Sequence, residues 1–241
     1  MPLLIEGKDI STAWLNAKDN IIGQPGHMCN NLIVCIANPL LIDQPVHEQY
    51  IDFCKDFDLT EPDKLSSTIF PRKMFSIVGQ DREKLYRKYP KLHKVLKGKW
   101  GSYFNQMINW SDGKTSCNQL EYIISKINER NKIHKAAYTI QIPYPTKHNG
   151  WPRGGPCLNN ILIQLKKNPN TMSIMAIYRS HDFAIKAYGN YMGLGHFLEF
   201  LASQTNFAIG TLTCISSHAF VEGKHISGLR KIIVPGGLND R

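Results

Sequence analysis

The residues best suited to chemistry lie together in the second half of the chain. Cys157 follows a Gly-Gly-Pro turn at 154–156, and Arg179 lies in the run 178–182, Tyr-Arg-Ser-His-Asp, at the end of the next apolar segment. The thiolate is the nucleophilic form of cysteine, and a nearby cation lowers the pKa of a thiol. An arginine also holds phosphate in two-point geometry. The pattern predicts an activated thiol beside an anion site, with a buried structural cysteine as the alternative.

Length and composition indicate an ordinary globular protein. The chain has 241 residues, of which 42% are hydrophobic and 20% are charged, values typical of a folded domain. One domain covering 1–241 is long enough to bury a core. No apolar run is long enough to cross a bilayer, and Glu6, Lys8 and Asp9 come too early for a signal peptide. We therefore expect a cytoplasmic protein without a membrane partner.

Cysteine spacing and net charge narrow the range of partners. The six cysteines form no CxxC pair and no metal-ligand cluster, so we expect reduced thiols and no bound metal. A formal net charge of +10 calls for an anionic partner, whether a nucleic acid, an anionic lipid or a phosphorylated small molecule. The one dense basic region, 82–99, is more typical of a solvated helix face than of a nucleic-acid stripe. A nucleic-acid partner is therefore not expected.

The hydrophobic pattern predicts an α+β fold. Short apolar or alternating segments predict strands at 3–5, 32–37, 136–142, 160–165, 172–178, 210–216 and 231–234. Amphipathic segments predict helices from Asp9 or Ser11 to 18, at 47–57, at 81–97 with a break or kink at Pro90, from a capping box at 116–119 through Ile127, and at 190–203. Segments 21–30 and 61–72 are expected to be loops, and the aromatic stretch 100–110 is either a ligand wall or core. Together these elements predict a single domain with a largely antiparallel or mixed sheet covered by helices.

An ordered set of residues in the second half resembles one family. Its members are Pro156-Cys157, Gln164, the run 179–182, Asn190 at the start of a helix and Gly210-Thr211-Leu212 before a strand. In order and spacing this set resembles thymidylate synthase and the related pyrimidine-nucleotide hydroxymethylases. The similarity covers the last half of the chain and, more loosely, the first. It implies a thymidylate-synthase-like fold in a short, divergent member of the family.

The resemblance implies a one-carbon transferase, either a methyltransferase or a hydroxymethyltransferase. The Cys157 thiolate would add to C6 of a pyrimidine nucleoside monophosphate, and C5 would then attack a one-carbon unit carried by 5,10-methylenetetrahydrofolate or a related reduced pterin. The other implied roles are phosphate binding by Arg179 and Ser180, ordering of that neighbourhood by Gln164, contact with the pterin side by Asp182 and reading of the pyrimidine edge by Asn190. An asparagine there favours uracil over cytosine, and a plain helix N-cap is the alternative for this residue.

The family also implies a homodimer whose two sheets pack face to face. His134 and Lys135 occupy the place from which basic residues reach the partner's phosphate site. The family's sugar-binding His-x-Tyr pattern is absent: counted without gaps it falls on Phe220 and Glu222, and with a two-residue shift on His218 and Phe220. Because a carboxylate accepts hydrogen bonds from two adjacent hydroxyls, Glu222 predicts a preference for ribose.

Two further departures from the family are visible, and the second leaves the product open. Leu158 replaces the histidine that commonly follows the cysteine, and the stretch after Val221 is shorter than the segment that the synthases close over the pterin. Without such closure, water could trap the C5 methylene group and give a hydroxymethyl product. The alternative from another class is a non-catalytic family member that binds a nucleotide or RNA through its basic surface.

Overall fold

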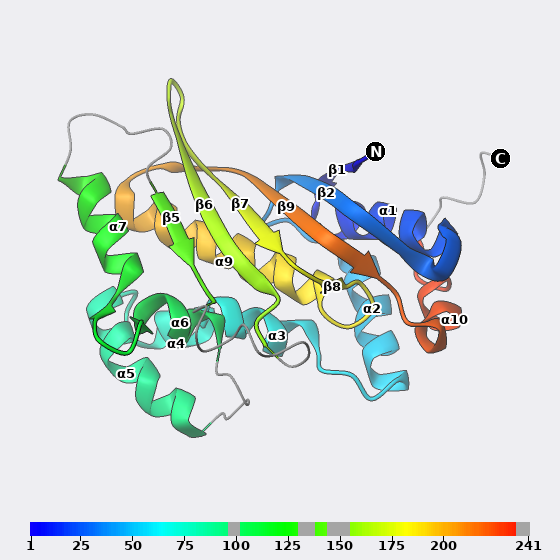
Figure 1. The fold of residues 1–241 in the computed structure, drawn as a ribbon, viewed down its shortest axis with the longest axis horizontal. Coiled ribbons are helices and arrows are strands. Elements are labelled where there is room, and N and C mark those ends of the chain that lie inside the picture. The colour runs from blue at the N-terminus through cyan, green and yellow to red at the C-terminus, as the bar shows by residue number, and fades with distance from the viewer. Residues whose placement is uncertain (96–101, 130–137, 144–154, 235–241) are drawn as a thin grey trace.

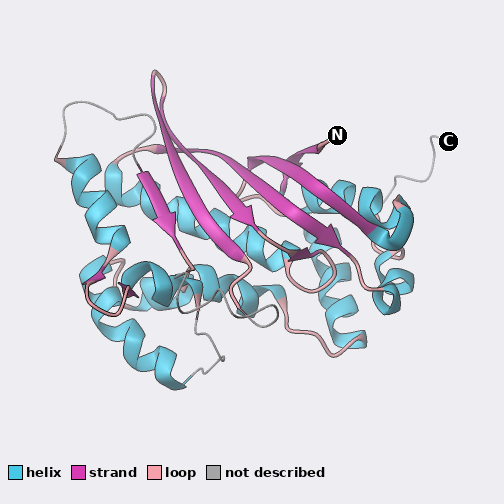
Figure 2. Cartoon of the chain, viewed as in Figure 1, coloured by secondary structure: helices cyan, strands magenta, loops and turns pink. Residues whose placement is uncertain are grey.

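The computed structural model describes residues 1–95, 102–129, 138–143 and 155–234. They form an α+β fold around a seven-stranded mixed sheet (Figure 2), so the predicted fold class is confirmed. Across the sheet the strands are β1 (Leu3–Asp9), β2 (Met28–Asn38), β9 (Ala208–Phe220), β7 (Asn170–Tyr178), β6 (Leu158–Lys167) and β5 (Tyr138–Gln141), and the short β8 (His181–Asp182) pairs with β9. The pairs β1–β2, β7–β9 and β8–β9 are parallel, and the others are antiparallel. Two further short strands, β3 (Trp110–Ser111) and β4 (Ser116–Cys117), pair only with each other.

Helices cover one face of the main sheet. They are α1 (Ile10–Gly23), α2 (Gln44–Asp56), α3 (Pro62–Ile69), α4 (Arg72–Ile77), α5 (Arg82–Val95), α6 (Tyr103–Ile108), α7 (Gln119–Asn128), α9 (Ala187–Thr205) and α10 (Ile226–Leu229), with 3-10 turns η1 (Pro25–His27) and η2 (Gly223–His225). In Figure 1, α9 and α1 lie behind the strands, and within the described ranges no helix lies in front of them. Of the helices in these ranges, none is long and apolar enough to span a membrane.

The face of the sheet that these helices leave open carries aliphatic side chains. Leu4, Ile33, Ile215 and Ile177 are successive neighbours across β1, β2, β9 and β7, and each of them is half-buried or exposed. The side chains that alternate with them, such as Leu32 on β2, are buried against the helices. Since side chains point to opposite faces along a strand, the sheet has one face in the core and one apolar face without cover from the described residues.

The long helix α9 is buried on nearly all sides because α3 packs on it opposite the sheet. Glycines allow this close approach: a Cβ on Gly193 would lie 2.7 Å from the carbonyl oxygen of Ser66, and one on Gly189 would lie 2.8 Å from the Cβ of Leu65. Real Cβ atoms do not come that close to other heavy atoms, so both positions require glycine. The helix that carries Asn190 is therefore fixed from two sides.

Proline positions explain where the expected elements differ from the structure. The predicted loop at 61–72 is wrong: it holds α3 and the start of α4, because Pro62 stands at the first helical position, where the missing N–H is not needed. Pro90 lies inside α5, which runs on to Val95. The predicted loop at 21–30 is also too long, since α1 continues to Gly23 and β2 begins at Met28. The cap at Asp9 is confirmed, since its side chain accepts the N–H of Thr12. The predicted capping box at 116–119 is wrong: Ser116 and Cys117 form β4, and the cap of α7 is Asn118, which accepts the N–H of Glu121.

The predicted strand at 231–234 is wrong. Its backbone groups pair with side chains of two helices: the buried Lys18 ammonium of α1 donates to the carbonyls of Leu229 and Ile232 at 3.0 and 3.1 Å. The amide of Gln49 on α2 bonds both the N–H and the carbonyl of Ile233. These contacts satisfy the backbone without a sheet ladder.

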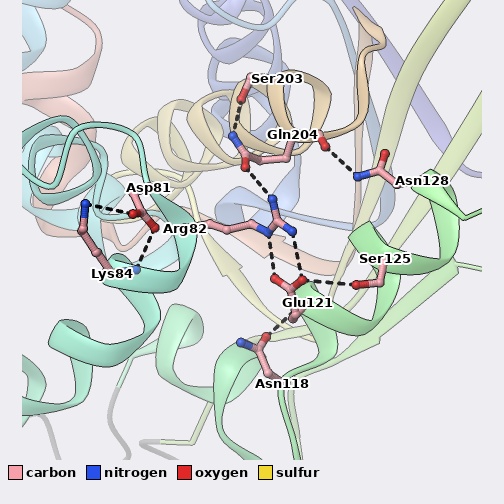
Figure 3. Close-up of polar contacts among 9 residues, drawn as sticks. All are labelled: Asp81, Arg82, Lys84, Asn118, Glu121, Ser125, Asn128, Ser203 and Gln204. Atoms are coloured by element: carbon pink, nitrogen blue, oxygen red, sulfur yellow. Dashed lines mark hydrogen bonds and ion pairs between the residues drawn. The ribbon is translucent and has the colours of Figure 1, made fainter.

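An ion pair joins the helices that border the other end of α9 (Figure 3). Arg82 at the start of α5 donates from Nε and Nη2 to the two carboxylate oxygens of Glu121 on α7, at 2.8 and 3.0 Å. Its Nη1 donates to the side chain of Gln204 near the end of α9, at 3.2 Å. The three helices α5, α7 and α9 are thus tied together through one guanidinium.

Candidate active site

Cys157 lies at the entrance to β6, in the turn that joins Pro156 to the strand. Its backbone N–H donates to the hydroxyl of Tyr103 on α6 at 3.3 Å, and its carbonyl accepts from the N–H of Arg179 at 2.9 Å. The side chain is half-buried. The backbone of the cysteine is therefore held from both sides while its side chain keeps some access to solvent.

Arg179 follows directly on β7, the antiparallel neighbour of β6. The register pairs Leu158 with Tyr178, so the residues next to them, Cys157 and Arg179, meet at the same end of the hairpin. The Arg179 Nε donates to the carbonyl of Pro156 at 3.1 Å, and the side chain is exposed. Its two Nη groups have no hydrogen-bond or ion-pair partner among the described residues, so they are available to an anion.

Burial and charge act on the Cys157 thiol in opposite directions. Burial is the larger effect and raises the pKa of the thiol above its ordinary value; the positive charges of Arg179 and then Lys186 oppose it, and Asp182 adds to it. The expected influence of Arg179 is present, but it does not lower the net pKa, because desolvation of the thiolate outweighs it. At rest the group is a thiol.

Two charged residues border this site from the turn before α9. Asp182 Oδ1 accepts the N–H groups of Ala184 and Ile185 at 2.9 and 3.0 Å, which fixes the turn. Burial raises the pKa of this carboxyl, and those two backbone groups oppose the rise. Lys186 is the N-cap residue of α9 and is exposed. The charges of Lys186 and Asp182 both change the pKa of the Cys157 thiol, the first lowering it and the second raising it.

Asn190 lies in the first turn of α9 and forms part of a buried polar chain. Since Lys186 occupies the N-cap position, the alternative interpretation of Asn190 as a helix cap is wrong. Its side-chain Nδ2 donates to Nε2 of His181 at 3.1 Å, and Nδ1 of His181 bonds the Ser216 hydroxyl at 3.0 Å. The imidazole is stacked on the ring of Tyr178, with centroids 4.0 Å apart. Asn190 is thus connected through His181 to the strand end that carries Arg179.

The remaining sequence candidates lie at different distances from the cysteine. Ser180 is half-buried between Arg179 and β8. Gln164 is exposed on β6 and pairs with Ser173, which puts it roughly 20 Å along the strand from Cys157 at the usual rise per residue. The structure does not bring it to the thiol.

The two sugar candidates lie at the end of β9. His218 bonds Asn30 of β2 through Nδ1 at 3.1 Å, and no contact within the described part of the chain links it to Cys157. Glu222 is exposed and forms an ion pair with Lys224 at 3.0 Å. Its charge reaches Asp182, so Glu222 lies at the border of the site and His218 outside it. His134 and Lys135 lie outside the described residues.

The structure adds three residues that sequence reasoning did not assign. Tyr103 falls within the aromatic stretch 100–110, for which a ligand wall was one interpretation, and it binds the backbone of Cys157 and Leu158. His181 stands inside the 179–182 run, but its partner Ser216 lies far along the chain. For Lys186, the only feature of the sequence that could have indicated a role at the site is its positive charge. Within the ranges the structure describes, no group of three or more His, Cys, Asp or Glu residues is placed to hold a metal ion.

Comparison with known proteins finds relatives that share one name. No protein-family model matches the chain. A "Putative thymidylate synthase" of Methanococcoides burtonii is 31% identical over 133 residues, which is 55% of this chain and 57% of that protein. Proteins of the same name from Methanosarcina acetivorans and Methanocaldococcus jannaschii are 30% identical over 121 residues and 27% identical over 124 residues, each match covering 50% of this chain and 52% or 55% of the relative.

The chain spans about half the length of the curated relatives it matches. The resemblance seen in the ordered motif set is confirmed by these matches, and the fold agrees with it. Over that half, the chain is similar to proteins named putative thymidylate synthase, at 27–31% identity.

Proposed function

We propose that this protein transfers a one-carbon group from a reduced pterin, such as 5,10-methylenetetrahydrofolate, to C5 of a pyrimidine nucleoside monophosphate. The observation that carries the proposal is the meeting of Cys157 and Arg179 at one hairpin end, with the guanidinium bonded to the turn that holds the thiol. This arrangement lets one ligand place its phosphate on the arginine and its base at the sulfur.

The chemistry follows from the order of bond changes. The Cys157 sulfur, as thiolate, forms a bond to C6, and the C5–C6 π electrons move onto C5 and O4 of the base. C5 then bonds to the one-carbon unit and loses its proton, and the bond between that carbon and the pterin nitrogen breaks, which leaves a C5 methylene group. A hydride from the tetrahydropterin, which is thereby oxidised to the dihydropterin, would give a methyl group, or a water would add and lose a proton to give a hydroxymethyl group. In either case the thiolate leaves C6 and the C5–C6 double bond is restored. Arg179 and Ser180 hold the phosphate, and Asn190 hydrogen-bonds the base edge. Asp182 borders the side from which the second substrate enters, and Glu222, whose charge acts on Asp182, is the candidate acceptor for the sugar hydroxyls.

The resting thiol needs a proton acceptor before it can add. Asp182 is the carboxyl whose charge reaches Cys157, and burial raises its pKa toward that of a useful base. Lys186 and Arg179 stabilise the thiolate once it forms. Among the described residues, the site therefore holds one candidate proton acceptor and two cations for the same sulfur.

The open face of the sheet supports the proposed homodimer. Leu4, Ile33, Ile177 and Ile215 form an aliphatic row on a face that no described element covers. A contiguous apolar sheet face is typical of an interface, and a two-fold axis would pair it with its own copy. Ile215→Lys, at the centre of this row, is expected to convert a dimer into a monomer in sedimentation equilibrium; an unchanged mass would refute this interface.

Release of tritium from C5 tests the proposed activity. The protein is incubated with C5-tritiated UMP, dUMP, CMP or dCMP and the pterin donor, and released tritium and product mass are measured. One substrate should lose tritium and gain either a methyl or a hydroxymethyl group. Cys157→Ser should abolish release, whereas Cys35→Ser, a half-buried cysteine on β2, should not. No release from any substrate, or release that survives Cys157→Ser, would refute the proposal.

A further inference from the structure

We propose that His181 is a positioning residue that fixes the side-chain amide of Asn190 in the orientation that selects a uracil-type base. The inference rests on the proposed function, because it assigns the base class of that site. It starts from a buried polar chain, Ser216–His181–Asn190.

The imidazole of His181 is locked by its surroundings. The residue is 1% exposed, and its ring lies parallel to that of Tyr178 with centroids 4.0 Å apart and 5° between the planes. Phe183 and Tyr191 contact it in edge-on geometry at 5.3 and 5.8 Å. A ring held between three aromatic side chains keeps both nitrogens in fixed directions.

The protons of the chain follow from which atoms can donate. The Nδ2 group of Asn190 has hydrogens to donate and does not accept, so Nε2 of His181, 3.1 Å away, is the acceptor and carries no proton. Burial lowers the pKa of His181 to about 3, and the ring is neutral near pH 7. With the amide in this direction, the single proton lies on Nδ1 and is donated to the Ser216 hydroxyl at 3.0 Å.

The tautomer of His181 and the direction of the Asn190 amide depend on each other, so in this tautomer the amide has one favourable direction. If the amide turned over, its oxygen would face the lone pair of Nε2, and a buried hydrogen bond would be replaced by two acceptors in contact. The oxygen, Oδ1, accepts no hydrogen bond among the described residues, yet it is not one of their buried atoms without a partner. It is therefore the atom that faces the open side of the site.

The fixed amide matches one type of pyrimidine edge. Oδ1 accepts from a ring N3–H, and the second hydrogen on Nδ2 donates to a carbonyl at C4, which is the pattern of uracil. Cytosine presents a bare N3 and an amino group, so both contacts would set donor against donor or acceptor against acceptor. A site built to hydrogen-bond one pattern rejects the other strongly, here by about 10- to 100-fold in affinity.

Two measurements test the inference. In 15N-labelled full-length protein, the ring nitrogens of His181 should show the shifts of a neutral imidazole protonated at Nδ1. Isothermal titration with UMP, dUMP, CMP and dCMP should show the uracil preference, and His181→Phe should cut it at least tenfold. Phenylalanine keeps the stacking on Tyr178 but offers no acceptor, and Phe183→Leu, which changes only the packing of the ring, is the matched control that keeps the preference.

The role of His181 and the proposed function can fail independently of each other in these measurements. A proton on Nε2, or a base preference that His181→Phe leaves unchanged, would overturn the inference while the proposed function stands. Should His181→Phe fail to fold, the tautomer in the unaltered protein decides. If the unaltered protein binds neither uracil nor cytosine nucleotides, the proposed function is refuted instead. The two failures can be told apart because the 15N measurement of the His181 tautomer does not depend on any ligand.

Discussion

Loss of the Arg82–Glu121 ion pair should lower the free energy of unfolding by an amount that can be worked out from its contacts and its exposure. The guanidinium makes two parallel bonds to the carboxylate, at 2.8 and 3.0 Å, and Glu121 also accepts from Ser125. The change Arg82→Met removes the charge and keeps an apolar stem of similar length. Through α5 and Tyr89, whose hydroxyl bonds the α6 cap residue Ser102 at 2.7 Å, this pair also supports the helix that carries Tyr103.

The expected loss is modest because the pair is partly solvated. The side chains of Arg82 and Glu121 are 28% and 34% exposed, so water re-solvates the carboxylate once its partner is gone. A fully buried pair would cost about 3–5 kcal/mol when broken, and a fully exposed one about 0–1 kcal/mol. Two-point geometry and a third bond to Gln204 put this one between those limits, at about 1.5 kcal/mol of unfolding free energy.

The loss should disappear in acid. The hydrogen bonds from Arg82 are the largest cause that lowers the pKa of Glu121 below 4.5. A carboxyl with a folded pKa below its unfolded value adds stability that is complete above the unfolded pKa and is lost as pH falls through the folded pKa. The difference between the protein and Arg82→Met is therefore constant at neutral pH and shrinks once the pH drops below 4.5.

Urea unfolding of the protein, Arg82→Met, Glu121→Gln and the double variant measures this coupling at pH 7 and near pH 3. We expect a coupling energy of about 1 kcal/mol at pH 7 and near zero in acid, because a protonated Glu121 pairs weakly with any residue at 82. A coupling below about 0.3 kcal/mol at pH 7 would show that solvent screens the pair completely. A coupling that persists unchanged in acid would show that it is not ionic.

Three further predictions follow from single contacts. The rate at which iodoacetamide alkylates Cys157 should rise with pH, with a midpoint above that of an ordinary thiol, because burial raises the pKa of this thiol. Arg179→Met should move the midpoint higher still, because the arginine opposes that rise. A midpoint that falls in the variant would refute this. Tyr188→Phe should cost about 1 kcal/mol of unfolding free energy because its hydroxyl is bonded, whereas Tyr191→Phe should cost nothing because its buried hydroxyl has no partner in the described structure. Gly193→Ala should destabilise by about 1–3 kcal/mol in thermal unfolding, because its Cβ would meet the α3 backbone at 2.7 Å.

Features that depend on neighbouring residues could be predicted from the sequence. The cap at Asp9 needs only a short acceptor side chain placed before an amphipathic run. The hairpin of β6 and β7 follows from two apolar runs on either side of the Asn-Pro-Asn turn at 168–170. Helix α3 could not be predicted in the same way, because prolines typical of loops also suit the first position of a helix.

Features that depend on register between distant segments could not be predicted. The role of His181 requires Ser216, and the two approach only because β8 pairs with the end of β9, His181 opposite Ala219. Tyr103 reaches the Cys157 backbone because α6 packs under the hairpin end. Neither contact can be deduced from the spacing of residues within the 179–182 run. The motif could therefore be found in the sequence, whereas the residues that position it were found only in the structure.

The contact between Cys157 and Arg179 could be predicted from neighbouring residues, but the pKa of the Cys157 thiol could not. The contact between Cys157 and Arg179 is a short-range consequence of hairpin pairing, since residues that flank a bonded pair at one end must be neighbours. The pKa of the thiol is a sum over the whole environment, in which desolvation outweighs both cations. Because the sum leaves a protonated sulfur, the cations cannot by themselves make Cys157 nucleophilic, and a proton acceptor must act with them. The one carboxyl whose charge reaches the sulfur is Asp182 in the part of the chain that is described, so a Cys157-dependent reaction that Asp182→Asn leaves at full rate would separate the thiol from this base.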